Sequence, residues 1–321
     1  MSQVYVVAVT TLKDLQREIN KLLGDKIILK AYGTNEEIVS GDLEKAEIVI
    51  TEPRYLLSSK LFDKCPNLKW FHSPWAGVEC ILKYDWTKNR PIITRTVGSY
   101  PQQMSEWAIG NMIASNRNFF AMKKYQLDHK WGKQDFRNFC SLYGKSIAIL
   151  GCGSIGKELA RKAKVFDMTV WAITKSSHEK CNFIDHHRHT NDLDEVLSNC
   201  DFICNVMPQT EETRGLLSGK RLSVCKKQPL FLNMGRGSII SDESLCEALD
   251  EKWIQGAVLD VFNEEPLPPS NKLYDYPNVF VTHHTAGVTF ANEVADDFAH
   301  KFEQYTSKKA MDDVVQVERG Y

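Results

Sequence analysis

The sequence lacks several features that would place the protein at a membrane, on nucleic acid or outside the cell. No apolar run approaches the roughly 20 residues that a membrane-spanning helix needs. The net charge is only −1, from 40 basic and 41 acidic residues, so neither nucleic acid nor an anionic membrane is indicated as a partner. The apolar run at residues 4–9 is too short for a signal peptide, and no basic segment precedes it. We therefore expect a cytoplasmic globular protein.

Paired cysteines are also missing. The nine cysteines are odd in number and follow no spacing typical of a zinc knuckle or a disulfide framework. Cys181 precedes three histidines, at positions 186, 187 and 189, in a segment that we expect to be a polar loop. A zinc site needs four well-placed ligands. We therefore predict reduced thiols, surface histidines and no bound metal.

Short apolar runs alternate with helical patterns along the whole chain. In the first hundred residues they predict a small α/β unit, with a helix over residues 12–23 and strands over 4–10, 26–31, 47–51, 70–73 and 92–94. A single long helical stretch is predicted over residues 101–130. Strand candidates then recur at residues 146–150, 168–173, 202–207, 229–233, 256–261 and 279–283, before a last helix over 290–308. This alternation predicts a doubly wound parallel sheet.

The glycine-rich segment at residues 145–156, KSIAILGCGSIG, is the most informative one. A β-branched apolar run leads directly into a G-x-G-x-x-G and a helix start, which is the context in which this motif indicates dinucleotide binding. The first glycine allows a tight turn, the second leaves room for a pyrophosphate, and the third lets the helix lie close to the strand. The N–H groups that open the helix attract phosphates. We predict that the cofactor is bound here by Gly151, Gly153, Ser154, Ile155 and Gly156.

The segment after the second strand indicates which cofactor is used. A carboxylate about 20 residues after the glycines usually holds the ribose of NAD. Here the strand ends in Thr174, Lys175, Ser176 and Ser177, and no acid is present. Hydroxyl groups and a lysine favour a 2′-phosphate through charge-assisted hydrogen bonds. We predict that Thr174, Lys175 and Ser176 select NADP(H). The alternative is that Lys175 is an ordinary solvated lysine and that NAD(H) is also accepted.

Three later segments place reactive side chains at the ends of predicted strands. Arg236 follows one strand in the sequence FLNMGRG, a glutamate pair precedes Pro266, and a histidine pair closes the last strand. The guanidinium fork of arginine suits a carboxylate. A histidine beside a carboxylate keeps its proton near neutral pH and can act as a general acid. Together the segments predict reduction of a carbonyl group to an alcohol, with a proton donor and a cation at the reacting oxygen.

With these motifs the chain resembles the D-isomer-specific 2-hydroxyacid dehydrogenases, and among them the NADPH-dependent glyoxylate/hydroxypyruvate reductases. Further segments that carry the resemblance are PWAGVE at residues 74–79, QMSEWA at 103–108 and MPQTEETRGL at 207–216. The resemblance covers almost the whole chain. It implies a Rossmann-type, doubly wound cofactor domain, residues 109–287, inserted into a smaller flavodoxin-like α/β domain of residues 1–108 and 288–321. It also implies a homodimer formed through the inserted domain.

The resemblance assigns roles to individual residues. It implies a catalytic triad in which His284 is the general acid in reduction, Glu265 holds its imidazole, and Arg236 binds the substrate carboxylate and polarises the keto oxygen. The implied substrate-binding residues also include Trp75 and the N–H groups of Ala76, Gly77 and Val78. Further implied cofactor contacts are Met207, Pro208, Thr213, Met234, Gly235 and Asp260, the last of them to the nicotinamide carboxamide.

Departures from the family pattern leave alternatives open. The family usually has a proline where His283 stands, so His283 competes with His284 as the proton donor. Trp75 is bulkier than the residue common at its position and is expected to narrow the substrate pocket. Two other functions remain open at this point. One is a nucleotide-sensing, corepressor-like binding protein on the same fold, and the other is an NAD-dependent D-2-hydroxyacid dehydrogenase.

Overall fold

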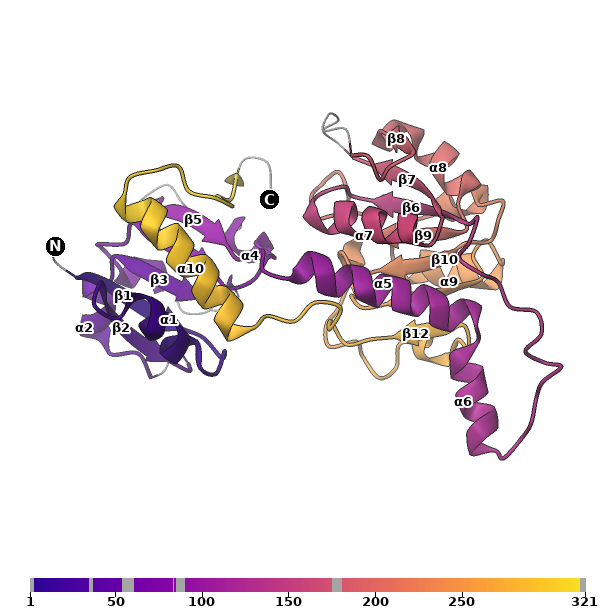
Figure 1. Ribbon diagram of the computed structural model, residues 1–321, viewed down its shortest axis with the longest axis horizontal. Helices are drawn as coiled ribbons and strands as arrows, with labels where there is room; N and C mark the ends of the chain where they lie inside the picture. The colour runs from indigo at the N-terminus through magenta and orange to yellow at the C-terminus, as the bar shows by residue number, and fades with distance from the viewer. Residues whose placement is uncertain are drawn as a thin grey trace. The chain divides into compact units, whose positions relative to one another are not determined.

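The computed structural model describes residues 3–34, 37–53, 61–82, 84, 90–174 and 181–317. The chain forms two compact units (Figure 1). Unit 1 consists of Met1–Ser99 together with Val288–Tyr321, and unit 2 consists of Tyr100–Gly287. Each unit contains one sheet in which the strands run parallel.

The sheet of unit 1 has five strands in the order β2-β1-β3-β4-β5. This order, 2-1-3-4-5, is that of a flavodoxin-like fold. The strands are β1 (Val4–Val9), β2 (Ile27–Tyr32), β3 (Ile48–Thr51), β4 (Trp70–Ser73) and β5 (Ile92–Arg95). The helical elements are α1 (Leu15–Leu23), α2 (Ser40–Lys45), η2 (Leu61–Lys64), α4 (Glu79–Leu82) and α10 (Ala291–Thr306).

Both faces of the unit 1 sheet are covered, because successive side chains of a strand point to opposite faces. Val6 and Ala8 of β1 face a cluster that contains apolar side chains of α1 and α10. Val7 and Val9 face a second cluster, with side chains from α2, η2 and α4. The C-terminal helix therefore packs on the first hundred residues of the chain.

The sheet of unit 2 has seven strands in the order β12-β11-β10-β9-β6-β7-β8. Counted from β6, this is the Rossmann order 3-2-1-4-5-6 with one further strand. The strands are β6 (Ser146–Leu150), β7 (Thr169–Ile173), β8 (His186–Arg188), β9 (Phe202–Asn205), β10 (Leu230–Asn233), β11 (Gly256–Leu259) and β12 (Val279–Val281).

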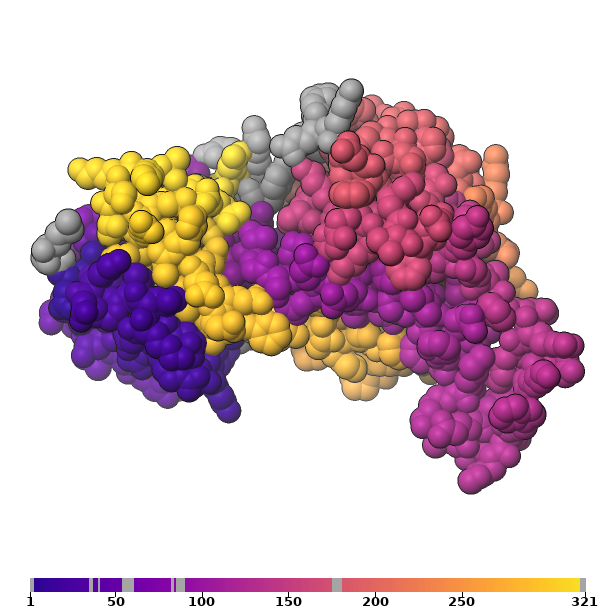
Figure 2. Space-filling model, in the orientation of Figure 1, coloured from indigo at the N-terminus to yellow at the C-terminus, as the bar shows by residue number. Residues whose placement is uncertain are grey.

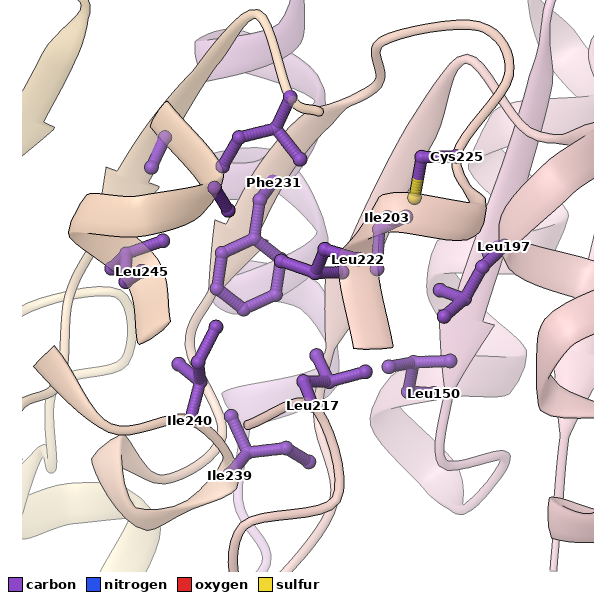
Figure 3. Packing of buried hydrophobic residues seen from close by; sticks show 14 of the residues in the cluster. Leu150, Leu197, Ile203, Leu217, Leu222, Cys225, Phe231, Ile239, Ile240 and Leu245 are labelled. Atoms are coloured by element: carbon purple, nitrogen blue, oxygen red, sulfur yellow. The ribbon is translucent and has the colours of Figure 1, made fainter. Parts of the chain in front are cut away.

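Helices cover both faces of this sheet as well. On one face, α5 (Tyr100–Asn116) packs on α7 (Ser154–Val165) over a cluster that includes Ile147 and Ile149. On the other face, Figure 3 shows Phe231 of β10 among Leu222, Ile240 and Leu245. The remaining helical elements are α6 (Phe119–Leu127), α8 (Leu193–Asn199), α9 (Asp242–Asp250), η3 (Thr190–Asp192), η4 (Arg221–Val224), η5 (Gly237–Ile239) and η6 (Lys272–Asp275). The α/β fold class predicted from the sequence is confirmed.

Two local predictions are wrong. The helix predicted over residues 101–130 is broken, because Asn118 adopts a left-handed backbone conformation with φ 54° between α5 and α6. The segment expected to be a polar loop after β7 contains an edge strand, β8. His186 in that strand stacks on Trp171 of β7, with 4.0 Å between the ring centroids. Within the described residues, no group of three or more His, Cys, Asp or Glu side chains is arranged to hold a metal ion.

None of the described helices is both long and apolar enough to cross a bilayer.

Candidate active site

The predicted cofactor and catalytic residues of unit 2 follow the carboxyl ends of its strands. Because all the strands are parallel, these ends lie on one edge of the sheet. In doubly wound sheets, ligands bind at this edge where the strand order reverses, which is here between β6 and β9. The residues concerned are Gly151–Gly156 after β6, Thr174 after β7, Met207, Pro208 and Thr213 after β9, Met234, Gly235 and Arg236 after β10, Asp260 after β11 and His284 after β12. Lys175 and Ser176 lie outside the described residues.

The turn between β6 and α7 is shaped to receive a pyrophosphate. Gly151 has a φ of 102°, and a Cβ on it would lie 3.1 Å from the backbone nitrogen of Met207. A Cβ on Gly156 would lie 2.1 Å from the carbonyl oxygen of Gly151, so α7 could not approach β6 with a larger residue there. A Cβ on Gly153 would meet no described atom within 4 Å. The turn is thus closed on the strand side and open above Gly153.

The start of α7 supplies hydrogen-bond donors to that open space. The first N–H groups of a helix have no partner within the helix. At Gly153, the residue that precedes α7, no described side chain caps them. These donors and the positive end of the helix dipole suit phosphate groups. The residues present therefore fit a dinucleotide.

Two buried asparagines, which were not predicted from the sequence, order the neighbouring loops. Asn205 ends β9 and Asn233 ends β10, and the Asn205 side chain donates to Asn233 Oδ1 at 2.8 Å. Asn205 Oδ1 accepts the backbone N–H of Met207 at 3.1 Å. Asn233 Nδ2 donates to the carbonyl oxygen of Arg236 at 3.1 Å. The pair thus joins the loop of Met207 to the loop of Arg236. The only signal in the sequence was a polar residue within the apolar run at 202–207 and another at the end of the run at 229–233.

The predicted residues after β9 form a closed loop. Thr213 Oγ1 donates to the carbonyl oxygen of Pro208 at 2.7 Å and accepts the N–H of Thr210 at 2.9 Å. The loop therefore keeps a defined path at the same edge of the sheet as the glycine turn.

Asp260 is buried and orders the loop that carries the histidine. Its carboxylate accepts the N–H of Thr285 at 2.8 Å and that of Ala286 at 3.0 Å, and it also accepts the hydroxyl of Thr282. Its carbonyl oxygen accepts the N–H of His284 at 2.9 Å. These bonds hold His284 in a left-handed backbone conformation with φ 56°. A strained conformation of this kind persists only where its surroundings enforce it, and such residues cluster at functional sites.

The imidazole of His284 forms an ion pair with Glu265. His284 Nδ1 lies 2.7 Å from Glu265 Oε2, and Glu265 Oε1 accepts the N–H of Phe262 at 2.9 Å. The hydrogen bond to Glu265 raises the pKa of His284, and it outweighs the burial that would lower it. Burial would raise the pKa of Glu265, but the hydrogen bonds from His284 and Phe262 lower it overall. The pair therefore favours the protonated form of the imidazole, in which the Nε2–H is the second donor of the ring.

Arg236 stands beside this pair. Its guanidinium donates from Nη1 to the carbonyl oxygen of Gly235 at 2.7 Å. Its positive charge acts on the pKa of both His284 and Glu265, lowering each of them. The Arg236 guanidinium and the imidazole paired with Glu265 therefore share one edge of one sheet.

Four predicted substrate residues, Trp75, Ala76, Gly77 and Val78, follow β4 in unit 1. Ser73 Oγ donates to the carbonyl oxygen of Trp75 at 2.8 Å and accepts the Trp75 N–H at 3.1 Å. In the described part of the chain, no hydrogen bond from the N–H groups of Ala76, Gly77 or Val78 is found. Consecutive backbone N–H groups without a protein acceptor are the donors from which anion-binding concavities are made.

Comparison with known proteins identifies the family. The family model of the D-isomer specific 2-hydroxyacid dehydrogenases, NAD binding domain, matches residues 109–286. The chain belongs to this family. A glyoxylate reductase of Thermofilum pendens is 30% identical over 236 residues, which are 73% of this chain and 70% of the relative. The predicted family membership is thus confirmed.

Solved structures agree with this assignment. A D-isomer specific 2-hydroxyacid dehydrogenase family protein from Aeromonas salmonicida has a TM-score of 0.87 at 28% identity, covering 98% of this chain and all of the other. An NADPH-dependent glyoxylate/hydroxypyruvate reductase from Sinorhizobium meliloti shares the fold, with a TM-score of 0.84 at 24% identity over 99% of this chain and all of that one. As a member of this family, the protein is an NAD(P)-dependent oxidoreductase that acts on the CH–OH group of small D-2-hydroxy acids.

Proposed function

We propose that the protein uses NADPH to reduce small 2-keto acids, such as glyoxylate or hydroxypyruvate, to D-2-hydroxy acids. The observation that carries this proposal is the His284–Glu265 ion pair beside Arg236, at the sheet edge that also carries the glycine turn. Reduction of a keto group requires a proton at the oxygen and a cation that stabilises the negative charge developing there.

A reduced nicotinamide supplies the hydride when it is bound. Arg236 binds the substrate carboxylate and polarises the keto oxygen, since a guanidinium fork suits two oxygens at once. His284 donates its Nε2 proton to the keto oxygen as negative charge develops there. Glu265 holds the imidazole by Nδ1 and stabilises its charged form until that proton leaves. In the oxidative direction the neutral imidazole takes the proton back from the hydroxyl group.

The substrate carboxylate is also bound by the carboxylate cradle, which is the name we give to the N–H groups of Ala76, Gly77 and Val78. Their lack of acceptors in the described structure supports this role. Trp75 precedes them and limits the size of the group that can follow the keto carbon. We therefore expect a preference for small 2-keto acids over those with a long side chain.

We expect NADPH oxidation on addition of glyoxylate or hydroxypyruvate to the purified full-length protein. Initial rates with a panel of 2-keto acids, followed by the absorbance of the reduced nicotinamide, give the substrate class directly. Tight NADPH binding without turnover of any 2-keto acid would favour a nucleotide-sensing protein instead.

The preference for NADP(H) rests on the sequence after β7, where positions 174–177 contain no acidic residue. Thr174 follows this strand, and its N–H donates to the carbonyl oxygen of Arg188 at 3.2 Å, which fixes it at the carboxyl edge. The Sinorhizobium meliloti reductase was solved in complex with NADP. Lys175 and Ser176 follow Thr174 directly in the sequence and complete the proposed site for the 2′-phosphate.

Replacing Thr174 by aspartate should move the preference toward NADH. The new carboxylate repels a 2′-phosphate and accepts hydrogen bonds from a ribose 2′-hydroxyl, which together should change the ratio of kcat/KM values for NADPH and NADH by about 10²-fold. Steady-state kinetics with both cofactors measures the ratio, and Thr174→Asn serves as the uncharged control. An unchanged ratio would mean that Thr174 does not face the ribose.

The dependence of reduction on pH should follow His284. The pKa of this histidine is raised, so the protonated donor is present below that pKa and kcat/KM falls as the pH rises through it. Replacing Glu265 by glutamine removes the largest cause of the raised pKa and leaves the burial that lowers it. The falling limb should therefore move to lower pH, and kcat at neutral pH should drop by about tenfold or more. Rates measured across the pH range for the wild type and Glu265→Gln check this, with Glu264→Gln as the neighbouring control.

A homodimer is the proposed assembly, formed by α6 and the segment that follows it in unit 2. Figure 2 shows this part of the chain, in magenta, standing out from the body of unit 2. No residue of α6 is buried, and Trp131 just beyond it is 92% exposed. An apolar arm of this kind suits a second copy of the chain. Sedimentation equilibrium should give twice the mass of the chain, and a monomer at micromolar concentration would contradict the proposal.

A further inference from the structure

Arg95 connects the proposed carboxylate cradle to the interior of unit 1. It is the last residue of β5, and it lies opposite Ser73 at the carboxyl end of β4. Its guanidinium Nη1 donates to the carbonyl oxygen of Ala76 at 3.0 Å. Its own carbonyl oxygen accepts a hydrogen bond from Lys301 Nζ at 3.1 Å. Arg95 is thus tied to the cradle by its side chain and to α10 by its backbone.

Lys301 makes this anchor rigid. Its side chain is fully buried, and its ammonium group also forms ion pairs with Asp297, at 2.5 Å, and with Asp313, at 3.0 Å. The three N–H donors of a lysine therefore each have an acceptor: two carboxylates and the Arg95 carbonyl. Because the bond to Arg95 is made to the main chain, it persists when the Arg95 side chain is changed.

The geometry of the peptide group explains what the Arg95 side chain does. In a planar trans peptide, the N–H points opposite to the C=O. Arg95 holds the Ala76 carbonyl, so the N–H of Gly77, which belongs to the same peptide group, points away from Arg95. Ser73 holds the Trp75 carbonyl in the same way, so the N–H of Ala76 points away from Ser73. Two consecutive N–H groups are thereby fixed in orientation by side chains that hold the opposite ends of their peptides.

We propose that Arg95 is a positioning residue for substrate binding, which holds the Ala76–Gly77 peptide so that its N–H meets the substrate carboxylate. The proposal rests on the proposed function, in which these N–H groups bind that carboxylate. The positive charge of Arg95 adds to the effect, because a hydrogen bond from a guanidinium to the C=O polarises the peptide and makes its N–H a stronger donor. Arg95 acts through the peptide and not on the reacting atoms.

Replacing Arg95 by methionine tests this role in the full-length enzyme. The same N–H holds the carboxylate in the bound substrate and in the transition state. A weaker hydrogen bond from this N–H should therefore raise KM and leave kcat within about twofold. We expect KM for glyoxylate to rise by about tenfold, which is the effect of one weakened charge-assisted hydrogen bond. The affinity for oxalate, measured calorimetrically on the NADP-bound enzyme, should fall by a similar factor. The Kd for NADPH should not change.

Two further variants serve as a control and as a conservative replacement in this test. Arg17→Met removes an exposed guanidinium of the same unit, which pairs only with surface acids among its described contacts, and should leave KM unchanged. Arg95→Lys retains a cation and should restore part of the affinity for glyoxylate that Arg95→Met loses. If the Arg95→Met protein does not fold, the Arg95→Lys protein is compared with the wild type in its place.

The outcomes separate this inference from the proposed function. A wild-type enzyme that reduces glyoxylate, combined with an Arg95→Met enzyme of unchanged KM and unchanged oxalate affinity, overturns the role of Arg95 alone. A fall in kcat with no change in KM overturns it as well. A wild-type enzyme that turns over no 2-keto acid overturns the proposed function, and the role of Arg95 with it.

Discussion

Replacing His284 by asparagine should lower kcat for 2-keto acid reduction by about 10²- to 10⁴-fold, the usual contribution of a positioned general acid. Asparagine has no proton to transfer at neutral pH, although its side chain can still accept a hydrogen bond. The dinucleotide turn is formed by other residues, so NADPH affinity should be retained. Steady-state rates of NADPH oxidation measure the loss, and NADPH fluorescence titration confirms that the fold persists.

The neighbouring histidine is the matched control. Both histidines are exposed, and it is His284 that forms the ion pair with Glu265. The variant His283→Asn should keep kcat within about twofold, as is usual for an exposed position away from the reacting atoms. The assignment of the proton donor is wrong if His283→Asn loses the activity and His284→Asn keeps it.

Replacing Arg236 by lysine should lower kcat/KM by about 10²- to 10³-fold, because a point charge cannot reproduce a two-point grip on carboxylate and keto oxygens. Both KM and kcat should be affected, since in the proposed function the guanidinium binds the substrate and also stabilises charge that develops in the transition state. The two constants, measured with glyoxylate at saturating NADPH, separate these effects.

A surface arginine of the same unit supplies the comparison for Arg236. Arg221 is paired with Asp194 on the surface at 2.7 Å, and Arg221→Lys should change neither constant. If Arg236→Lys behaves like Arg221→Lys, then Arg236 does not contact the substrate.

Apart from the edge strand β8, the strands described in both units were predicted from the sequence, because their apolar runs are continuous. Residues 70–73 and 146–150 were predicted with the bounds that the structure shows. Other strands end earlier than predicted: β9 ends at Asn205 and not at residue 207, and β11 ends at Leu259 and not at residue 261. Met207 and Val261 are buried although they follow the strands. An apolar run in the sequence therefore indicates which residues are buried, but it does not indicate where the hydrogen bonds between neighbouring strands end.

The proposed catalytic residues were predicted from motifs, but the residues that hold the loops of the proposed site were not. Asn205, Asn233 and Arg95 act through hydrogen bonds to backbone groups that are distant in the sequence or lie on a neighbouring strand. Such contacts depend on the order of the strands and on register, and no local pattern encodes them. In the same way, Asn118 interrupts a helical apolar pattern through a backbone conformation that the pattern does not contain.

The motifs in the sequence do not show which histidine pairs with which glutamate. Both the glutamate pair and the histidine pair offered two candidates in the sequence. The structure joins one member of each pair at 2.7 Å, because Asp260 holds the His284 loop and the Phe262 N–H holds Glu265. The hydrogen bonds that hold the two loops, and not the residue types, thus determine which histidine and which glutamate form the ion pair.

The most direct test of the account is a crystal structure of the enzyme with NADP and oxalate, a dicarboxylate that is not reduced. We predict that His284 Nε2 lies within about 2.6–3.2 Å of the oxalate oxygen that occupies the place of the keto oxygen. The Arg236 guanidinium should contact the same oxygen and an oxygen of the adjoining carboxylate, next to the nicotinamide ring. A complex in which oxalate and the nicotinamide ring meet away from His284 and Arg236 would contradict the proposed chemistry.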